Sequence, residues 1–249
     1  MARIVKNQFT IAAFFLVLIA AGAETQNATH HDKRALIPVQ AFVGGWRGVG
    51  QPKRGSNQGA WTEESQWSWR FQQGHAELVA QISQGKYYAR FLLQAGDKTG
   101  QFVLLALPIE KDQSDPPPPP QRFLGTLRED TLELTAEDPA EDRPARISIR
   151  LVAAGDRMLV LYEKRLAEGT FARLAEVGST RKGSSFAKAA ASGPECVVTG
   201  GLGTIAVTHK GQKYFVCCTG CRDLFLDDPE KALVEYRQRK EDEKAELNK

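Results

Sequence analysis

The chain is poor in cysteine, and the little it has is confined to one end. Only four cysteines occur among 249 residues, and all of them lie from residue 196 onward. Disulfide scaffolds are built from a much denser set of cysteines, so the chain as a whole does not read as one. The formal net charge is only +3, which gives no case for nucleic acid as a partner.

Catalytic motifs are also missing. The sequence has no Gly-x-Ser-x-Gly motif, no P-loop and no convincing order of Ser, His and Asp. Glu63 and Glu64 read as the polar face of a strand rather than as an acid/base pair. His75 follows a glycine in a turn and reads as a solvated residue, which disfavours haem. The sequence therefore does not point to an enzyme.

Long apolar runs are absent apart from one at the N-terminus, over residues 11–20. Arg3 and Lys6 precede this run, and an Ala-x-Ala motif ending at Ala23 follows it. The pattern predicts a signal peptide over residues 1–23, with an uncleaved anchor as the alternative. No cysteine follows closely enough for lipid attachment. We therefore expect a periplasmic or secreted protein that meets the membrane only through the signal peptide before cleavage.

Residues 24–36 are polar and non-periodic, and they predict a disordered leader. From residue 37 to 182 the pattern is β, with short alternating or apolar runs separated by turn residues. The runs are 41–49, 61–71, 76–82, 87–93, 102–107, 123–127, 132–135, 147–152, 158–162 and 171–177. About ten strands joined by hairpin-length turns favour an antiparallel up-and-down meander, and closure into a barrel would remove its exposed edges.

A second, smaller domain is predicted over residues 194–249, after a small and polar linker at 183–193. Two short β runs, 204–209 and 212–216, suggest a hairpin. A helix is expected to begin near Arg222 and another at Pro229, since proline suits a first helical position. The end of the domain is almost entirely charged and reads as a solvated helical tail.

The four cysteines fall within this second domain. Cys196 stands alone, and Cys217, Cys218 and Cys221 crowd into five residues about twenty positions later. A thiolate cluster drawn from two separated pieces of backbone is suited to a soft or borderline metal such as zinc or copper. Two disulfides in an oxidising compartment are the alternative, and adjacent cysteines disfavour it. Thiol–disulfide exchange through Cys218-x-x-Cys221 is a third interpretation.

The segments Pro194 to Gly200 and Lys210 to Pro229 together resemble the YHS/TRASH-type metal-binding domain, which is hairpin-plus-helix and treble-clef-like. The shared features are a cysteine beside a glycine loop, an aromatic pair, a cysteine knuckle and Phe-x-x-Asp-Pro. The resemblance implies heavy-metal binding in sensing, trafficking or accessory roles.

By position, Cys196, Cys217 and Cys221 match the cysteines of that family. Relatives with a Cys-x-x-Cys loop have a second cysteine where this chain has Val198 or Thr199. Cys218 is then the expected fourth ligand, with His209 or an open position as alternatives.

A second resemblance concerns the first domain. Gly44-Gly45-Trp46, within the segment 42–48, resembles the opening of lipocalin-like (calycin), nitrobindin-type and fatty-acid-binding-type barrels. Trp67 and Trp69 alternate along one predicted strand, so their rings share a face. These rings, with Trp46, either fill the barrel interior or form a pocket for a small apolar ligand.

Taken together, the residues predict an exported metal-binding accessory protein whose barrel is a scaffold, a docking surface for a protein partner or a pocket. The alternative is a lipocalin-like small-molecule carrier with a zinc-stapled C-terminal domain.

Overall fold

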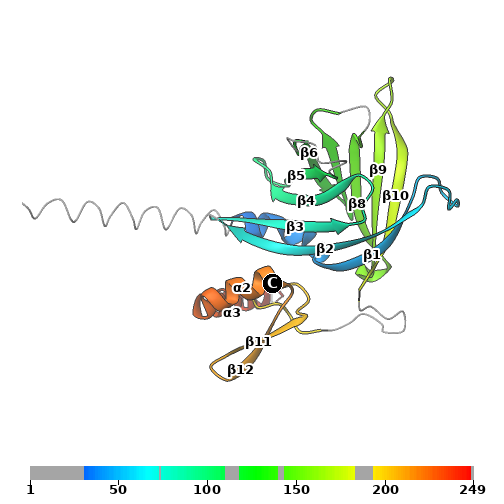
Figure 1. The fold of residues 1–249 in the computed structure, drawn as a ribbon. Helices are drawn as coiled ribbons and strands as arrows, with labels where there is room; N and C mark the ends of the chain where they lie inside the picture. The colour runs from blue at the N-terminus through cyan, green and yellow to red at the C-terminus, as the bar shows by residue number, and fades with distance from the viewer. Residues whose placement is uncertain (1–30, 73, 110–117, 140–142, 183–192, 248–249) are drawn as a thin grey trace, which may run out of the picture.

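The computed structural model describes residues 31–72, 74–109, 118–139, 143–182 and 193–247 (Figure 1). Within these residues a closed β-barrel is followed by a small module of one hairpin and two helices. The predicted fold class, mainly β with an antiparallel barrel, is confirmed. No helix in the described part of the chain is long and apolar enough to cross a membrane. The predicted signal peptide and most of the predicted linker lie outside the described residues.

Each of the ten predicted strands is present, and each pairs with its neighbours in sequence order until β1 pairs with β10. The strands are β1 (Gly44–Gln51), β2 (Trp61–Gln72), β3 (His75–Ser83), β4 (Tyr88–Ala95), β5 (Gln101–Pro108), β6 (Gln121–Arg128), β7 (Thr131–Ala136), β8 (Arg146–Val152), β9 (Arg157–Arg165) and β10 (Phe171–Arg181). Closure through Trp46 opposite Arg181 leaves neither β1 nor β10 as a free edge along its paired length.

Alternation along each strand decides which side chains fill the interior. In β2, Glu63, Trp67 and Trp69 are buried, whereas Thr62 before Glu63 and Gln66 before Trp67 are exposed. A two-residue period of this kind directs one set of side chains inward and the other toward solvent. The inward rings of Trp67 and Trp69 are each 1% exposed and belong to the core.

The chain enters the barrel through a short helical segment rather than through a strand. The first strand was predicted to begin at residue 41, but residues 37–42 form a 3₁₀ helix, η1 (Ile37–Phe42). The ring of Phe42 packs edge-on against Trp67 at 5.6 Å. The carbonyl of Phe42 accepts a hydrogen bond of 2.9 Å from the indole N–H of Trp46. These contacts hold the segment against the core and delay the first strand to Gly44.

The predicted disordered leader also differs from the structure at its end. Residues 31–36 are helical, and Leu36 is fully buried in the barrel core. Asp32 accepts a hydrogen bond from the backbone N–H of Ala76 and lies 2.9 Å from the ring of His75. Burial of one leucine and capture of one carboxylate explain the order of a stretch whose composition is polar. Residues 24–30 lie outside the described part.

The C-terminal module contains β11 (Ile205–His209), β12 (Gln212–Val216), α2 (Thr219–Asp227) and α3 (Pro229–Leu247). The hairpin turns at Lys210 and Gly211, which both have positive φ, as a two-residue type I′ turn requires. Phe225 of α2 is fully buried beneath the hairpin and lies 5.8 Å from the ring of Tyr214. The hairpin and α2 therefore share a small core around one phenylalanine.

The module docks on the barrel where β1 stops covering β2. Pairing of β1 with β2 ends at Gly44 opposite Trp67, although β2 continues to Gln72. α2 lies against this free stretch of β2 (Figure 1). A Cβ atom on Gly220 would lie 1.8 Å from the carbonyl oxygen of Trp69, so only glycine allows the approach. The barrel and the module thus share one continuous apolar cluster.

A carboxyl group is buried on the inward face of β2. Glu63 is 7% exposed and accepts a hydrogen bond of 2.8 Å from the indole N–H of Trp61. Burial raises the pKa of Glu63 above its ordinary value of 4.5, and the Trp61 hydrogen bond offsets this only in part. The folded barrel therefore holds the Glu63 proton more tightly than the unfolded chain does.

We expect Glu63→Gln to be more stable than the wild type at pH 8. A raised carboxyl pKa means that the ionised form destabilises the fold, and this penalty grows as pH rises above the unfolded value of 4.5. The melting temperature of Glu63→Gln should exceed that of the wild type at pH 8 and approach it below pH 4.5. Glu64→Gln is the control. The pKa of Glu64 is lowered by its hydrogen bond from Lys182, so its difference should have the opposite sign.

Gly220→Ala tests the close approach of α2 to β2. In an ordinary helix this change is stabilising by up to about 1 kcal/mol, because alanine has the higher helix propensity. Here the added methyl group meets the Trp69 carbonyl, and we expect a loss of about 1–3 kcal/mol in the free energy of unfolding, as for overpacking. Leu226→Ala, at an exposed position of α2, controls for the helix itself. Equal or greater stability of Gly220→Ala in chemical denaturation would contradict this packing.

Candidate metal centre

Cys196 lies in a tight turn at the start of the module. Its N–H donates to the carbonyl of Gly201 at 2.7 Å, and the N–H of Gly200 donates back to the Cys196 carbonyl at 2.8 Å. Gly200 has φ of +79°, a conformation that residues with a side chain seldom adopt. Val197 then donates to the carbonyl of Phe215 at 2.9 Å, which ties the turn to β12.

The other three cysteines follow β12 directly. Cys217 is the first residue after the strand, Cys218 is the N-cap residue of α2, and Cys221 lies in the first turn of that helix. The change from an extended strand to a helix within two residues turns the side chains of Cys217 and Cys221 toward the same point. Because the Cys196 turn is bonded to Phe215, that point also lies beside Cys196.

The structure brings three of the predicted ligands together. The sulfur atoms of Cys196, Cys217 and Cys221 all lie within 4.8 Å of one another, and all three residues are buried. The sulfurs of Cys217 and Cys221 are 3.5 Å apart. This is far longer than a disulfide bond of about 2.05 Å. All four cysteines of the chain are free. Three thiols at this spacing form a buried cluster that could hold a metal ion.

Hydrogen bonding among the sulfurs separates their acidities. The pKa of Cys196 is lowered to about 2, chiefly because Cys217 and Cys221 donate to its sulfur. The pKa of Cys218 is lowered to about 3 by the same two donors. Donation to Cys196 raises the pKa of Cys217, and burial is the main cause of the raised pKa of Cys221. These hydrogen bonds favour the ionised forms of Cys196 and Cys218 over those of Cys217 and Cys221.

The predicted fourth ligands occupy different places. Cys218 lies beside the cluster, with its sulfur 3.9 Å from that of Cys217, but it does not belong to the group of three. Its sulfur accepts a hydrogen bond of 3.3 Å from the backbone N–H of Trp69. His209 lies 3.0 Å from a carboxylate oxygen of Glu230 and is likewise outside the group. Ligation by Cys218 stays a prediction.

Thr199 is one of the two residues, with Val198, that the resemblance places opposite the second cysteine of a Cys-x-x-Cys loop. The hydroxyl of Thr199 lies 3.6 Å from the sulfur of Cys217, and Thr199 is 2% exposed. Thr199 also hydrogen-bonds to Cys196 through both its side chain and its backbone. The Thr199 hydroxyl therefore contacts the cluster at one of the two positions from which the resemblance would supply a thiolate.

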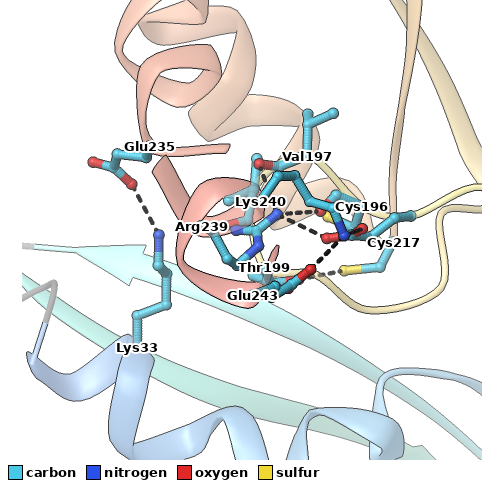
Figure 2. Close-up of polar contacts among 11 residues, drawn as sticks. Lys33, Cys196, Val197, Thr199, Cys217, Glu235, Arg239, Lys240 and Glu243 are labelled. Carbon is cyan, nitrogen blue, oxygen red and sulfur yellow. Dashed lines mark hydrogen bonds and ion pairs between the residues drawn. The ribbon is translucent and has the colours of Figure 1, made fainter. Parts of the chain in front are cut away.

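Arg239 of α3 donates hydrogen bonds to the Cys196 turn. The sequence analysis assigned this residue to a solvated tail. The Arg239 guanidinium donates to the carbonyl of Cys196 at 3.2 Å and to the carboxylate of Glu195 at 3.1 Å (Figure 2). It lies within 3.5 Å of the carbonyls of Val197 and Val198 as well. Only its place in a charged run was visible in the sequence, where nothing distinguishes Arg239 from its neighbours.

A second contact of α3 ties the module to the N-terminal helical segment. Lys33 and Glu235 form an ion pair of 3.0 Å, in which the lysine side chain is only 12% exposed (Figure 2). Residues 200 positions apart in sequence thus meet at the docking seam, and composition does not predict such a pair.

The predicted tryptophan pocket lies in the core of the barrel. Trp46, Trp67 and Trp69 are each at most 1% exposed. Trp67 contacts Phe91 at 6.1 Å, and Trp69 stacks on Phe71 at 5.7 Å. Trp67 and Trp69 therefore pack against other aromatic side chains, and the Arg181 guanidinium lies over the Trp46 ring at 4.2 Å. All three indoles fill space in the core, the first of the two alternatives in the sequence analysis.

Comparisons with known proteins add little. No family model matches the sequence, and no curated protein matches it significantly. The crystal structure of Rv2717c from M. tuberculosis matches with a TM-score of 0.37 and 16% sequence identity, covering 59% of this chain and 97% of that chain. The case for a function therefore rests on the residues of this chain.

Arg239→Ala should loosen the Cys196 turn. Loss of the guanidinium removes its hydrogen bonds to the Cys196 carbonyl and to the Glu195 carboxylate, and we expect a cost of about 1–3 kcal/mol in the free energy of unfolding. Amide hydrogen exchange at residues 196–201 should quicken relative to the wild type. Arg237→Ala is the matched control, since Arg237 is exposed and bonds only within its own helix, to Leu233. Unchanged exchange at the turn would contradict the role of Arg239.

Proposed function

We propose that the chain is an exported metal-binding accessory protein that holds one zinc or copper ion through Cys196, Cys217 and Cys221. The observation that carries this proposal is the convergence of three buried sulfurs from two separated stretches of chain. Thiolates suit soft and borderline ions rather than hard ones such as magnesium or calcium. Export is proposed from the N-terminal pattern alone, a charged start, one apolar run and an Ala-x-Ala motif.

The surroundings of the cluster fit a metal–thiolate centre. Metal binding requires deprotonated sulfur, and the lowered pKa of Cys196 means that at least one ligand is already ionised at neutral pH. The first turn of α2 presents its positive dipole end beside Cys221. The Arg239 cation lies on the other side, against the Cys196 turn. These groups offset negative charge that several thiolates would bring into a buried site.

A bound ion would also supply stability that the module lacks. Its core is formed by one hairpin and one short helix around Phe225, and domains this small rarely fold without a staple. A metal joined to Cys196 on one side and to Cys217 and Cys221 on the other would close the loop between them. The accessory function would then consist of carrying, presenting or sensing the ion, with the barrel as scaffold.

Metal content is the direct test. The chain purified without reductant and under nitrogen should contain one zinc or copper ion by elemental analysis, with its thiols shielded from a thiol reagent until chelator is added. Cys196→Ser, Cys217→Ser and Cys221→Ser should each lower metal affinity by more than about 100-fold, since loss of an outer contact alone already costs 10–100-fold. Chelation should lower the melting temperature of the wild type.

Other outcomes of this experiment identify the alternatives. Two disulfides and no metal would mean that the cysteines are a covalent staple, and the proposal would fall. A metal-free protein that reduces a disulfide substrate at Cys218 would indicate thiol–disulfide exchange. A small apolar molecule released on denaturation, with zinc that resists exchange, would favour the carrier function.

A further inference from the structure

The four cysteines do not occupy equivalent positions. Cys217 and Cys221 each interact with Cys196 and with Cys218, whereas Cys218 falls outside the group whose sulfurs all lie within 4.8 Å. In a tetrahedral site with metal–sulfur bonds of about 2.3 Å, all sulfur pairs would be roughly 3.8 Å apart. The sulfurs of Cys196, Cys217 and Cys221 all lie within 4.8 Å of one another. The Cys218 sulfur lies 3.9 Å from that of Cys217 but does not belong to this mutually close group.

The Cys218 sulfur contacts the barrel at Trp69 of β2. Pairing with β1 ends at Trp67, so the Trp69 amide two residues later has no partner from β1. The Cys218 sulfur fills that place and accepts the Trp69 N–H at 3.3 Å. Both groups are buried, since Cys218 is 4% exposed and Trp69 is 1% exposed. An unpaired amide would be costly there, so the bond ties Cys218 to the edge of β2.

The seam between the barrel and the module includes the shared apolar cluster and the Lys33–Glu235 ion pair. It also contains a groove of about 580 Å³ between parts of β2, β3 and α2, lined by Arg70, Phe71, Asp223 and Asp227 among others. Two residues of the module contact the backbone of Trp69 directly. These are Cys218, which accepts the Trp69 amide, and Gly220, which lies against the Trp69 carbonyl. The backbone of Trp69 is therefore contacted on its N–H by Cys218 and on its carbonyl by Gly220, two residues that lie between Cys217 and Cys221.

We propose that Cys218 is a docking residue rather than a ligand, and that the remaining three sulfurs form a three-coordinate site selective for Cu(I). The inference rests on the proposed function and specifies its metal. Cu(I) is a soft ion that is satisfied by three thiolates, whereas structural zinc takes four protein ligands. Only three sulfurs of the described residues lie within 4.8 Å of one another, and the Thr199 hydroxyl rather than a further thiol contacts Cys217, so no fourth thiolate completes the group that zinc would need.

The experiment uses the full chain loaded anaerobically with Cu(I) or with Zn²⁺. X-ray absorption at the copper edge should show three sulfur neighbours in the wild type, and at the zinc edge three sulfurs with one lighter atom. Competition with a chromophoric Cu(I) chelator should give Cys218→Ser an affinity within about threefold of the wild type. Cys217→Ser, the same change at the adjacent buried residue, should weaken Cu(I) binding by more than about 100-fold.

Hydrogen exchange tests the docking half of the proposal. Cys218→Ala removes the acceptor, and exchange at the Trp69 amide should quicken by about tenfold, the value of one ordinary hydrogen bond. Cys218→Ser retains an acceptor and should restore most of the protection. A purely structural role in packing would not be rescued by the hydroxyl.

The remaining outcomes distinguish a failure of the three-coordinate site from a failure of metal binding altogether. Four sulfurs around copper, or equal losses for Cys218→Ser and Cys217→Ser, would make Cys218 a ligand and overturn this inference while the proposed function stands. Stoichiometric zinc with four sulfurs and no Cu(I) uptake would do the same. A wild type that binds neither ion overturns both. The sulfur count is measured on the wild type, so it stands even if a variant fails to fold.

Discussion

The backbone hydrogen bond from the N–H of Val197 to the carbonyl of Phe215 joins the two stretches of chain that carry the sulfur cluster. Cys196 and Cys217 are separated by a hairpin, and nothing in their sequence distance brings them together. The Val197 bond places the Cys196 turn alongside the end of β12, one residue before Val216 and two before Cys217. Thr204 adds a second bond to the carbonyl of Val216 at 2.9 Å. Backbone pairing, rather than cysteine chemistry, thus prepares the site.

The barrel contributes to the same site through an edge that it leaves open. β1 is shorter than β2, and the uncovered end of β2 presents the amide and carbonyl of Trp69 to the module. Open strand edges are a liability, and proteins commonly cover them. Here the cover is the cysteine knuckle. The same segment, Cys217 to Cys221, covers the edge of β2 and carries two of the three sulfurs of the proposed metal centre. A change in the position of β2 at Trp69 is therefore expected to affect the sulfurs.

Much of this architecture could be predicted from local patterns. Two-residue alternation, as in Trp67 and Trp69, identified the strands, and hairpin-length turns between them implied an antiparallel order. The convergence of Cys196 with Cys217 and Cys221 could be predicted from the affinity of thiolates for metals and from the resemblance of the two segments that carry them. The strand signals are local, since each is carried by residues close together in sequence.

The missed features all depend on contacts between distant residues. Burial of Leu36 orders a segment whose composition is polar, and Arg239 resembles every other charge in its helix until the turn that it holds is known. The interaction of Cys218 with Trp69 joins a side chain to a backbone amide 149 residues away. Any residue except proline has a backbone N–H that can donate such a hydrogen bond, so the presence of tryptophan at position 69 does not predict this contact.

The Arg239 cation and the Trp69 amide both lie where they could stabilise negative charge on the cysteine sulfurs. Three thiolates around Cu(I) would leave a net charge of −2 in a buried site, and an isolated buried charge is strongly unfavourable. The Arg239 cation lies against the Cys196 turn and would offset part of that charge. The Cys218 sulfur lies 3.9 Å from that of Cys217 and accepts a hydrogen bond from the Trp69 amide, so negative charge on this sulfur has a donor on the barrel side. In the proposed arrangement, three sulfurs would bind the ion and the fourth would contact the barrel.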